Sequence, residues 1–169
     1  PWDIPSLKTL EEYGMDAYKV ASADLTNHEL IEAIAKTGKP IILSTGMSTE
    51  KEIIETVDVL KRLGAPYILL NCNSTYPAPF KDVNLQYLGR LKEIGDCLVG
   101  YSGHERGINI ALAAIAYGAK VIEKHFTLDK DMEGNDHKIS LLPKEFKSMV
   151  EGIRQIEEAM GTDSARVIG

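Results

Sequence analysis

The chain reads PIILSTGMSTEKEIIETVDVLKRLGAPYILLNC over residues 40–72. Short apolar runs at both ends of this stretch, 40–44 and 67–72, are typical of buried β-strands. Between them, Thr49 and Glu52 match the capping box that opens a helix, and Gly64 is placed to end it. The stretch therefore predicts a strand–helix–strand unit, which is the usual connection between parallel strands.

The same unit repeats along the whole chain, with apolar runs roughly 22 to 31 residues apart. The runs are 17–20, 40–44, 67–72, 97–102 and 120–126. Helical patterns lie between and after them, namely the segments 27–38, 49–64, 85–94, 107–117 and 143–161. Apolar strands with helical crossovers predict an α/β fold with a parallel sheet covered on both faces. The pattern leaves open both a doubly wound sheet and part of a (β/α)8 barrel.

Composition sets broad limits on partners and location. The 169 residues are 44% apolar, and 25 acidic residues against 19 basic ones give a formal charge of −6, which argues against nucleic acid as a partner. A small anion remains possible, because a pocket can be locally positive. No secretory signal can be read in the first residues, and no apolar segment is long enough to span a membrane, so no membrane partner is expected. Cys72 and Cys97 match neither a disulfide framework nor a zinc pattern, and a cytoplasmic setting is expected.

Polar residues gather where the predicted strands end. In both candidate architectures, ligands bind at the carboxyl ends of parallel strands. The strand ends are Ala21-Ser22-Ala23-Asp24, Ser44-Thr45-Gly46-Met47, Asn71-Cys72-Asn73-Ser74, Tyr101-Ser102-Gly103-His104 and Glu123-Lys124-His125. Small hydroxyls, histidines and a lysine on one rim predict a site for an anionic, oxygen-rich ligand.

Five strings at these strand ends resemble the N-acetylneuraminate synthase family, together with its relatives that make legionaminic or pseudaminic acid. The strings are YKVAS (18–22), GKPIILSTGM (38–47), TYPAPF (75–80), GYSGH (100–104) and VIEKHFT (121–127). Each string alone is a weak signal, but the ordered set is specific. The resemblance runs in register from about Trp2 to Gly161.

The resemblance implies a partial TIM (β/α)8 barrel, because the catalytic domain of the family has that fold. Residues 1–161 would supply strands four to eight with their helices, and 162–169 would begin a linker to a C-terminal antifreeze-like domain. Strands one to three, and with them the glutamate that is catalytic in the family, are expected to lie outside this chain. The intact protein is expected to be a homodimer.

The activity implied by the resemblance is that of a transferase. It would condense phosphoenolpyruvate with N-acetylmannosamine, or a related amino sugar, to give a nine-carbon keto acid of the sialic acid type plus phosphate. Two alternatives stay open. The chain could be a catalytically incomplete fragment of such an enzyme, or it could be another phosphoenolpyruvate-dependent synthase or aldolase on the same barrel.

Four residues are expected to hold the anionic substrate. Lys19 lies inside a predicted strand, where a buried cation is costly unless it faces an anion, and the resemblance implies that it binds phosphoenolpyruvate. Ser22 and Ser44 match serines that donate hydrogen bonds to the same ligand, and Ser102 has a similar place on the rim. The alternatives are a lysine that reaches solvent and hydroxyls that cap the following turns.

A divalent cation, Mn²⁺ or Mg²⁺, is the cofactor that the resemblance implies. His104 matches a metal ligand of the family. Asn71 departs from the pattern, because many bacterial members have a second metal-binding histidine there, and its amide oxygen predicts looser Mn²⁺ binding and more tolerance for Mg²⁺. Glu123 and His125 are two residues apart on one strand and so share a face, where they would either orient the metal ligands or form a structural pair.

The resemblance places Asp24, Asn73 and Tyr76 at the sugar, with turn formation or packing as the alternative. Asp136 lies in a polar loop after the last strand that resembles a loop of the family and would close over the site; a simple Asx turn is the alternative. Cys72 is expected to be a small buried apolar residue and not a nucleophile, because no recognised base flanks it.

Overall fold

A computed structural model describes residues 1–162 of the chain. The predicted linker, 162–169, lies outside the described residues except for Thr162. The two cysteines are free thiols, in agreement with the prediction from the sequence. Within residues 1–162, none of the helices is both long and apolar enough to cross a membrane.

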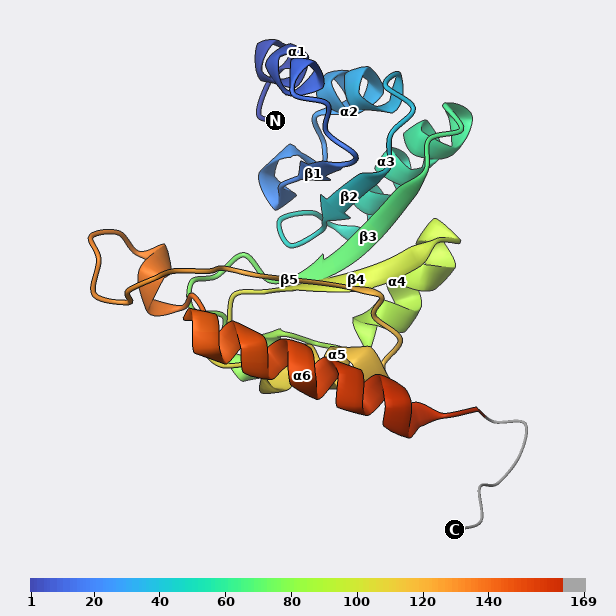
Figure 1. The fold of residues 1–169 in the computed structure, drawn as a ribbon. Helices are drawn as coiled ribbons and strands as arrows, with labels where there is room; N and C mark the ends of the chain where they lie inside the picture. The colour runs from blue at the N-terminus through green and yellow to red at the C-terminus, as the bar shows by residue number, and fades with distance from the viewer. Residues whose placement is uncertain (163–169) are drawn as a thin grey trace.

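The sheet consists of five parallel strands whose order in space, β1-β2-β3-β4-β5, is their order along the chain (Figure 1). The strands are β1 (Tyr18–Val20), β2 (Ile41–Ser44), β3 (Tyr67–Cys72), β4 (Leu98–Gly103) and β5 (Val121–Lys124). A doubly wound sheet reverses its strand order at a switch point, but this sheet does not. The structure is therefore a five-stranded half-barrel, as the resemblance implied.

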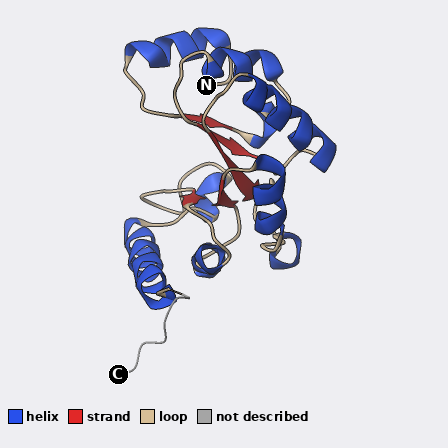
Figure 2. Ribbon diagram, turned by 90° about the vertical axis from the view of Figure 1, so that its right-hand side faces the viewer, coloured by secondary structure: helices blue, strands red, loops and turns tan. Residues whose placement is uncertain are grey.

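Six α-helices accompany the strands among the described residues and lie on the outer side of the sheet (Figure 2). They are α1 (Ile4–Glu12), α2 (His28–Ala35), α3 (Glu50–Arg62), α4 (Tyr87–Gly95), α5 (Asn109–Ala116) and α6 (Pro143–Met160). Short 3-10 turns, η1 (Ser22–Asp24), η2 (Phe80–Asp82) and η3 (Asp136–Lys138), follow β1, β3 and β5.

The prediction that both faces of the sheet are covered is wrong for the described residues. In β2, Ile41 and Leu43 face the helices and are fully buried, but Ile42 between them is only partly buried. The reason is the curvature of a barrel wall, because its helices lie on the outer side only and the inner face is left to line a pocket.

Local signals fixed most of the element boundaries. The capping box is present at α3, where Thr49 accepts from the Glu52 amide and the Glu52 carboxylate accepts from the Thr49 amide at 2.7 Å. Asn27 caps α2 by accepting from the Leu30 amide. Gly64 follows α3 with a φ of 62°, a left-handed conformation that glycine adopts at little cost.

Helix α1 was not predicted from the sequence. Asp3 caps this helix by accepting from the Ser6 amide at 2.7 Å, Pro5 lies in its first turn, and Leu7 packs into the core. Asp3 followed by Pro5 is a recognisable start signal, but the segment contributes little apolar periodicity. Leu85, which was grouped with the third predicted helix, lies outside α4.

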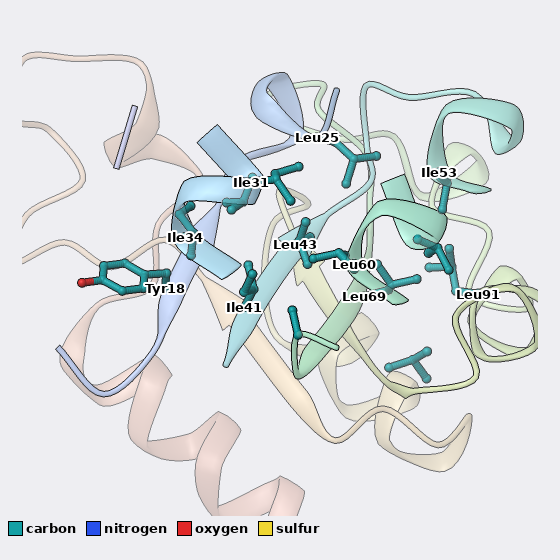
Figure 3. Close-up of a cluster of buried hydrophobic side chains, with 14 of the residues drawn as sticks. Tyr18, Leu25, Ile31, Ile34, Ile41, Leu43, Ile53, Leu60, Leu69 and Leu91 are labelled. Carbon is teal, nitrogen blue, oxygen red and sulfur yellow. The ribbon is translucent and has the colours of Figure 1, made fainter. Parts of the chain in front are cut away.

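The core fills the space between the sheet and its helices (Figure 3). Ile31 and Ile34 of α2 meet Leu43 of β2, while Leu60 of α3 and Leu69 of β3 continue the same layer. All five side chains are completely buried. Truncating one such side chain to alanine costs about 2–5 kcal/mol, so this layer holds the strands in place.

Gly100 of β4 gives a test of how tightly the inner wall is packed. A Cβ atom there would lie 2.4 Å from the Val121 carbonyl oxygen and 2.5 Å from a Leu70 methyl group. Gly100→Ala is expected to lower the free energy of unfolding by about 1–3 kcal/mol, because a backbone atom must move. Urea denaturation would measure the change.

Gly89 is the matched control. It is exposed on α4, and nothing lies within 4 Å of a Cβ added there. Gly89→Ala is expected to raise the free energy of unfolding by about 0.5–1 kcal/mol through helix propensity. Equal effects of the two substitutions would contradict the packing described for β4.

Candidate active site

A pocket of about 290 Å³ opens at the carboxyl ends of the strands. All five strands or the turns that follow them contribute to its lining. The register explains how distant residues meet, because Cys72 pairs with Ser102, and Ser102 pairs with Glu123. The three side chains therefore form one row across β3, β4 and β5 on the inner face.

Most of the predicted site residues meet in this pocket. Those that line it are Lys19, Ser22, Ser44, Tyr76, Ser102, His104, Glu123 and His125. Asp136 lies beside it, with a carboxylate oxygen 3.7 Å from His125 Nδ1. Asp24, Asn71 and Asn73 are not part of the lining.

Lys19 lies on the inner face of β1. Its ammonium group donates to the Val20 carbonyl at 2.8 Å and lies 3.5 Å from the Glu123 carboxylate. The contact with Glu123 joins the two outermost strands of the sheet across the inside of the half-barrel. A third of the Lys19 side chain remains exposed, so the charge can still meet an anion in the pocket.

Two hydroxyl groups line the same pocket as this lysine. The Ser44 side chain is buried, and its hydroxyl has no hydrogen-bond partner among the described residues. An unsatisfied buried hydroxyl costs free energy, so this group is suited to a ligand in the pocket. The Ser22 hydroxyl accepts from the Gly46 amide at 3.1 Å and donates to the Cys72 thiol.

Gly46 is required for the close approach of two strand ends. A Cβ atom there would lie 2.7 Å from the Ser74 hydroxyl and 2.9 Å from the Cys72 carbonyl oxygen. Glycine at this position lets the turn after β2 pack on the end of β3. The Gly46 amide is thereby brought to Ser22, so three strand ends meet beneath the pocket.

His104 is held in one tautomer. Its Nδ1 atom lies 2.6 Å from the Asn73 carbonyl oxygen, which can only accept, so Nδ1 carries the proton. Its Nε2 atom then offers a lone pair beside the Tyr76 hydroxyl, 3.0 Å away. Tyr76 stacks on the His104 ring with the two centroids 4.1 Å apart. The His125 ring contacts the His104 ring edge-on, with centroids 5.2 Å apart.

The surroundings move the pKa values of these groups in opposite directions. Burial opposes a charge on His104, but its contacts with the Cys72 thiol and the Asn73 carbonyl outweigh burial and raise its pKa. Burial and the neighbouring His104 lower the pKa of His125. Burial raises the pKa of Cys72, but the hydrogen bond and charge of His104, together with the hydroxyls of Ser22 and Ser102, outweigh burial, and the pKa is lowered.

The donor set fits a divalent cation at His104. An imidazole whose Nδ1 proton is engaged by a carbonyl presents Nε2 as a ligand, which is the usual arrangement at metal sites. In the described part of the chain, no three His, Cys, Asp or Glu side chains gather closely enough to form a complete metal site. A cation at His104 would therefore need further ligands from substrate or water.

Asn71 does not reach the pocket. It pairs with Tyr101 and lies on the opposite face of β3 from Cys72, where its amide nitrogen donates to the carbonyls of Val83 and Asn84. Its side chain therefore holds the segment before α4. Metal ligation by Asn71 stays a prediction, and His104 and Asn71 do not share the pocket.

Asn73 and Asp24 stabilise turns in this structure. The Asn73 side chain accepts from the Thr75 amide and donates to the Asp82 carbonyl, while its main-chain carbonyl holds His104. One Asp24 oxygen accepts from Asn27, and the other is buried without a partner among the described residues. Their roles at the sugar stay predictions.

Several lining residues were not singled out from the sequence. They are Trp2, Ala21, Ala23, Met47 and Ser74. Cys72 was expected to be a small buried apolar residue, but it is only partly buried, lines the pocket and hydrogen-bonds with Ser22 and His104. The pocket positions of Cys72 and Ser74 could have been found, because they share the face of Ser102 and His104 by the two-residue period of a strand. Trp2 could not, because it precedes α1 and reaches the pocket only through the fold.

The fold and this polar rim define the class, an α/β half-barrel with a ligand pocket at the carboxyl ends of its strands. A family profile described as the NeuB family matches residues 1–165. The chain therefore belongs to the NeuB family.

The names of similar proteins are consistent with membership of this family. The N,N'-diacetyllegionaminic acid synthase of Campylobacter jejuni is 51% identical over 95% of this chain and 49% of its own length. The human N-acetylneuraminate-9-phosphate synthase is 37% identical over 98% of this chain and 46% of its own length. The chain spans about half the length of the curated relatives it matches.

A solved structure has the same fold. The crystal structure of the N-acetylneuraminic acid synthetase of Leptospira borgpetersenii, in complex with citrate, superposes with a TM-score of 0.94 at 39% identity. The match covers 99% of this chain and 59% of that chain. The half-barrel is thus a known part of enzymes of this family.

The opposite shifts of the two pocket histidines can be measured. We expect the His104 ring to titrate above the ordinary pKa of about 6.5 and the His125 ring to titrate below it. Since His104 gains affinity for its proton on folding, its contribution to stability is present at low pH and is lost as pH rises through its folded pKa.

NMR of the imidazole protons would follow both titrations, with His104→Gln to assign the signals. Cys72→Ala is expected to lower the pKa of His104, because it removes the thiol that favours the charged ring. A His125 pKa at or above that of His104 would contradict the electrostatics of the pocket.

Proposed function

We propose that this chain is the substrate-binding part of an enzyme that condenses phosphoenolpyruvate with N-acetylmannosamine or a related amino sugar. The observation that carries the proposal is that one pocket is lined both by Lys19 and by the buried Ser44 hydroxyl, which has no hydrogen-bond partner within residues 1–162. The family and its named relatives, which are synthases of sialic-acid-type sugars, support the same reaction.

The anionic end of phosphoenolpyruvate binds at β1 and β2 in this proposal. Lys19 supplies the charge, and the hydroxyls of Ser22 and Ser44 donate to oxygens of the phosphate or carboxylate, with Ser102 close by. Holding the anion in this way fixes the direction of its C3 methylene, and such orientation can account for a large share of a rate enhancement.

The sugar binds at the ring cluster on the other side of the pocket. Tyr76 and His125 flank His104, whose Nε2 atom is the proposed metal ligand. A divalent cation bound there, Mn²⁺ or Mg²⁺, supplies Lewis-acid polarisation of the sugar aldehyde. Glu123 and Asp136 place negative charge beside these rings and favour a cation in the pocket.

The reaction forms one carbon–carbon bond and releases one phosphate. The C3 methylene of phosphoenolpyruvate attacks the aldehyde carbon, and the aldehyde oxygen takes a proton. Water adds at C2, and the tetrahedral carbon then expels phosphate to leave the keto group. Lys19 and the serines hold the anion throughout, so the leaving phosphate stays hydrogen-bonded as charge builds on it.

Other parts of the proposal concern the whole protein. The five strands are assigned to strands four to eight of a (β/α)8 barrel, which places the remaining strands and the proton-transferring glutamate of the family in another segment. A cytoplasmic homodimer with no nucleic acid or membrane partner completes the assignment. A chain that carries binding groups without that glutamate would be catalytically incomplete by itself.

Phosphate release tests the reaction. It would be measured with phosphoenolpyruvate, N-acetylmannosamine and Mn²⁺, for this chain alone and with the N-terminal half of the Campylobacter jejuni relative added. Release only in the mixture supports both the reaction and the division of groups between the two parts. Release by the chain alone would require an acid–base group within these residues.

Lys19→Ala is expected to raise the KM for phosphoenolpyruvate about 10- to 100-fold, because a charge-assisted hydrogen bond contributes about 1.5–3 kcal/mol. The matched control is Lys39→Ala, since Lys39 pairs with Glu11 outside the pocket. An unchanged KM in Lys19→Ala would contradict the anion site.

Metal titration tests Asn71. If Asn71 ligates the cation, Asn71→His should bind Mn²⁺ more tightly, because imidazole is the better ligand for a transition metal. Activity or electron paramagnetic resonance with Mn²⁺ and Mg²⁺ would show the change. No gain in affinity would exclude Asn71 from the metal and fit its hydrogen bonds behind β3.

A further inference from the structure

Three polar side chains form a buried cluster behind the pocket. Lys124 Nζ lies 2.9 Å from a Glu105 carboxylate oxygen and donates to the Glu105 main-chain carbonyl at 2.6 Å. The Tyr101 hydroxyl donates to the other Glu105 oxygen at 2.5 Å. The side chains of Glu105 and Lys124 are completely buried.

The cluster and the pocket lie on opposite faces of the same two strands. Lys124 is the residue between Glu123 and His125 in the chain, and Tyr101 precedes Ser102. Since successive side chains of a strand alternate between faces, the neighbours of the cluster point into the pocket while the cluster does not. Accordingly, Glu123, His125, Ser102 and His104 line the pocket, and no member of the cluster does.

Stability alone does not account for such a cluster. A buried ion pair loses its hydration, and apolar side chains of similar size are often equally stable or more stable in its place. The three short contacts of this cluster instead fix the positions of its side chains relative to one another. Gly103 leaves room for the cluster because it has no side chain. A Cβ atom there would lie 2.7 Å from a Glu105 oxygen and 2.7 Å from the Tyr101 ring.

The cluster acts where the sheet ceases to hold the chain. β4 ends at Gly103, whose register partner is Lys124, so His104 lies just beyond the strand. Lys124 donates a hydrogen bond to the main-chain carbonyl of Glu105, the residue after His104. This contact links the segment that carries His104 to the end of β5, directly before His125.

We propose that Tyr101, Glu105 and Lys124 are positioning residues that set the arrangement of His104 and His125 in the pocket. They act from behind the sheet and touch neither ring. Their hydrogen bonds do not reach the anion site on β1 and β2, which is linked to β5 by the partly exposed contact of Lys19 with Glu123, so their effect should fall mainly on the sugar side of the pocket. Any effect on catalysis rests on the proposed function, but the effect on the rings does not.

The arrangement of the rings can be read without substrate or metal. The chain has four histidines, and stacking on Tyr76 places His104 in an aromatic environment that alters its NMR shifts. In Lys124→Met, the ring signals of His104 and His125 should move, while the signal of His28 on α2 should not. Lys124→Arg, which keeps the charge, should move them less.

Thr56→Val is the matched control. Thr56 is another buried polar residue, whose hydroxyl donates to the Leu25 carbonyl and contacts His28. This variant should lose stability and move the His28 signal, while the signals of His104 and His125 stay in place. Glu105→Gln keeps the size of the side chain and replaces Lys124→Met if the latter fails to fold.

In the active whole protein, Lys124→Met should lower kcat about 10- to 100-fold, since misplacement by about 1 Å has effects of that size. The KM for phosphoenolpyruvate should stay within about 2-fold, because a factor of 10 in affinity would need about 1.4 kcal/mol at the anion site.

The proposal would be overturned if a folded but less stable Lys124→Met or Glu105→Gln variant left the NMR signals of His104 and His125 unmoved. It would also be overturned if the KM for phosphoenolpyruvate rose by the same factor as kcat fell. Moved ring signals, together with a whole protein whose wild type releases no phosphate from phosphoenolpyruvate, would uphold the positioning role and reject the proposed function instead. The two hypotheses can therefore fail separately.

Discussion

The parallel register of the five strands is the constraint on which the rest of this structure depends. Parallel strands in chain order bring all carboxyl ends to one edge, and alternation then assigns each side chain to the pocket or to the core. A shift of one residue in β5 would exchange Lys124 with its neighbours and put an unpaired cation into the pocket. Such a register shift would disrupt the core and the site together, which few other changes would do.

The pocket divides into two chemically different sides because different strands supply them. β1 and β2 contribute a lysine and small hydroxyls, which suit an anion, whereas β3 to β5 contribute a stacked group of rings with acidic residues beside them. The contact of Lys19 with Glu123 joins the two sides and spans the inside of the half-barrel. In the proposed function, the opposite charges at that junction would let an anion and a cation be held in one small volume.

Two kinds of interaction hold the site in shape. Apolar packing of Leu43, Leu60 and Leu69 fixes the strands, but it lacks the directional contacts needed to orient a ring beyond a strand end. Around His104, hydrogen bonds supply the orientation. The Asn73 carbonyl holds the ring directly, and the Glu105–Lys124 pair holds the following residue on the outer side of the sheet. Directional contacts are costly to bury, which is why they are confined to the segment next to the pocket.

The sequence by itself determined the strands, most of the helices and the family, because these depend on local patterns. The capping box at Thr49 and Glu52 and the apolar runs of β2 and β3 are readable in a few consecutive residues. The order of polar strand ends likewise predicted that Lys19, Ser44 and His104 would meet.

Tertiary structure decided what depends on contacts between distant segments. Only the fold put Trp2 at the pocket, turned Asn71 to the helix side of β3 and brought Glu105 to Lys124. A polar residue near a strand end can face either side, and the choice is made by register and by the partners that burial supplies. Which polar residues line the site and which ones hold it from behind therefore cannot be read from spacing alone.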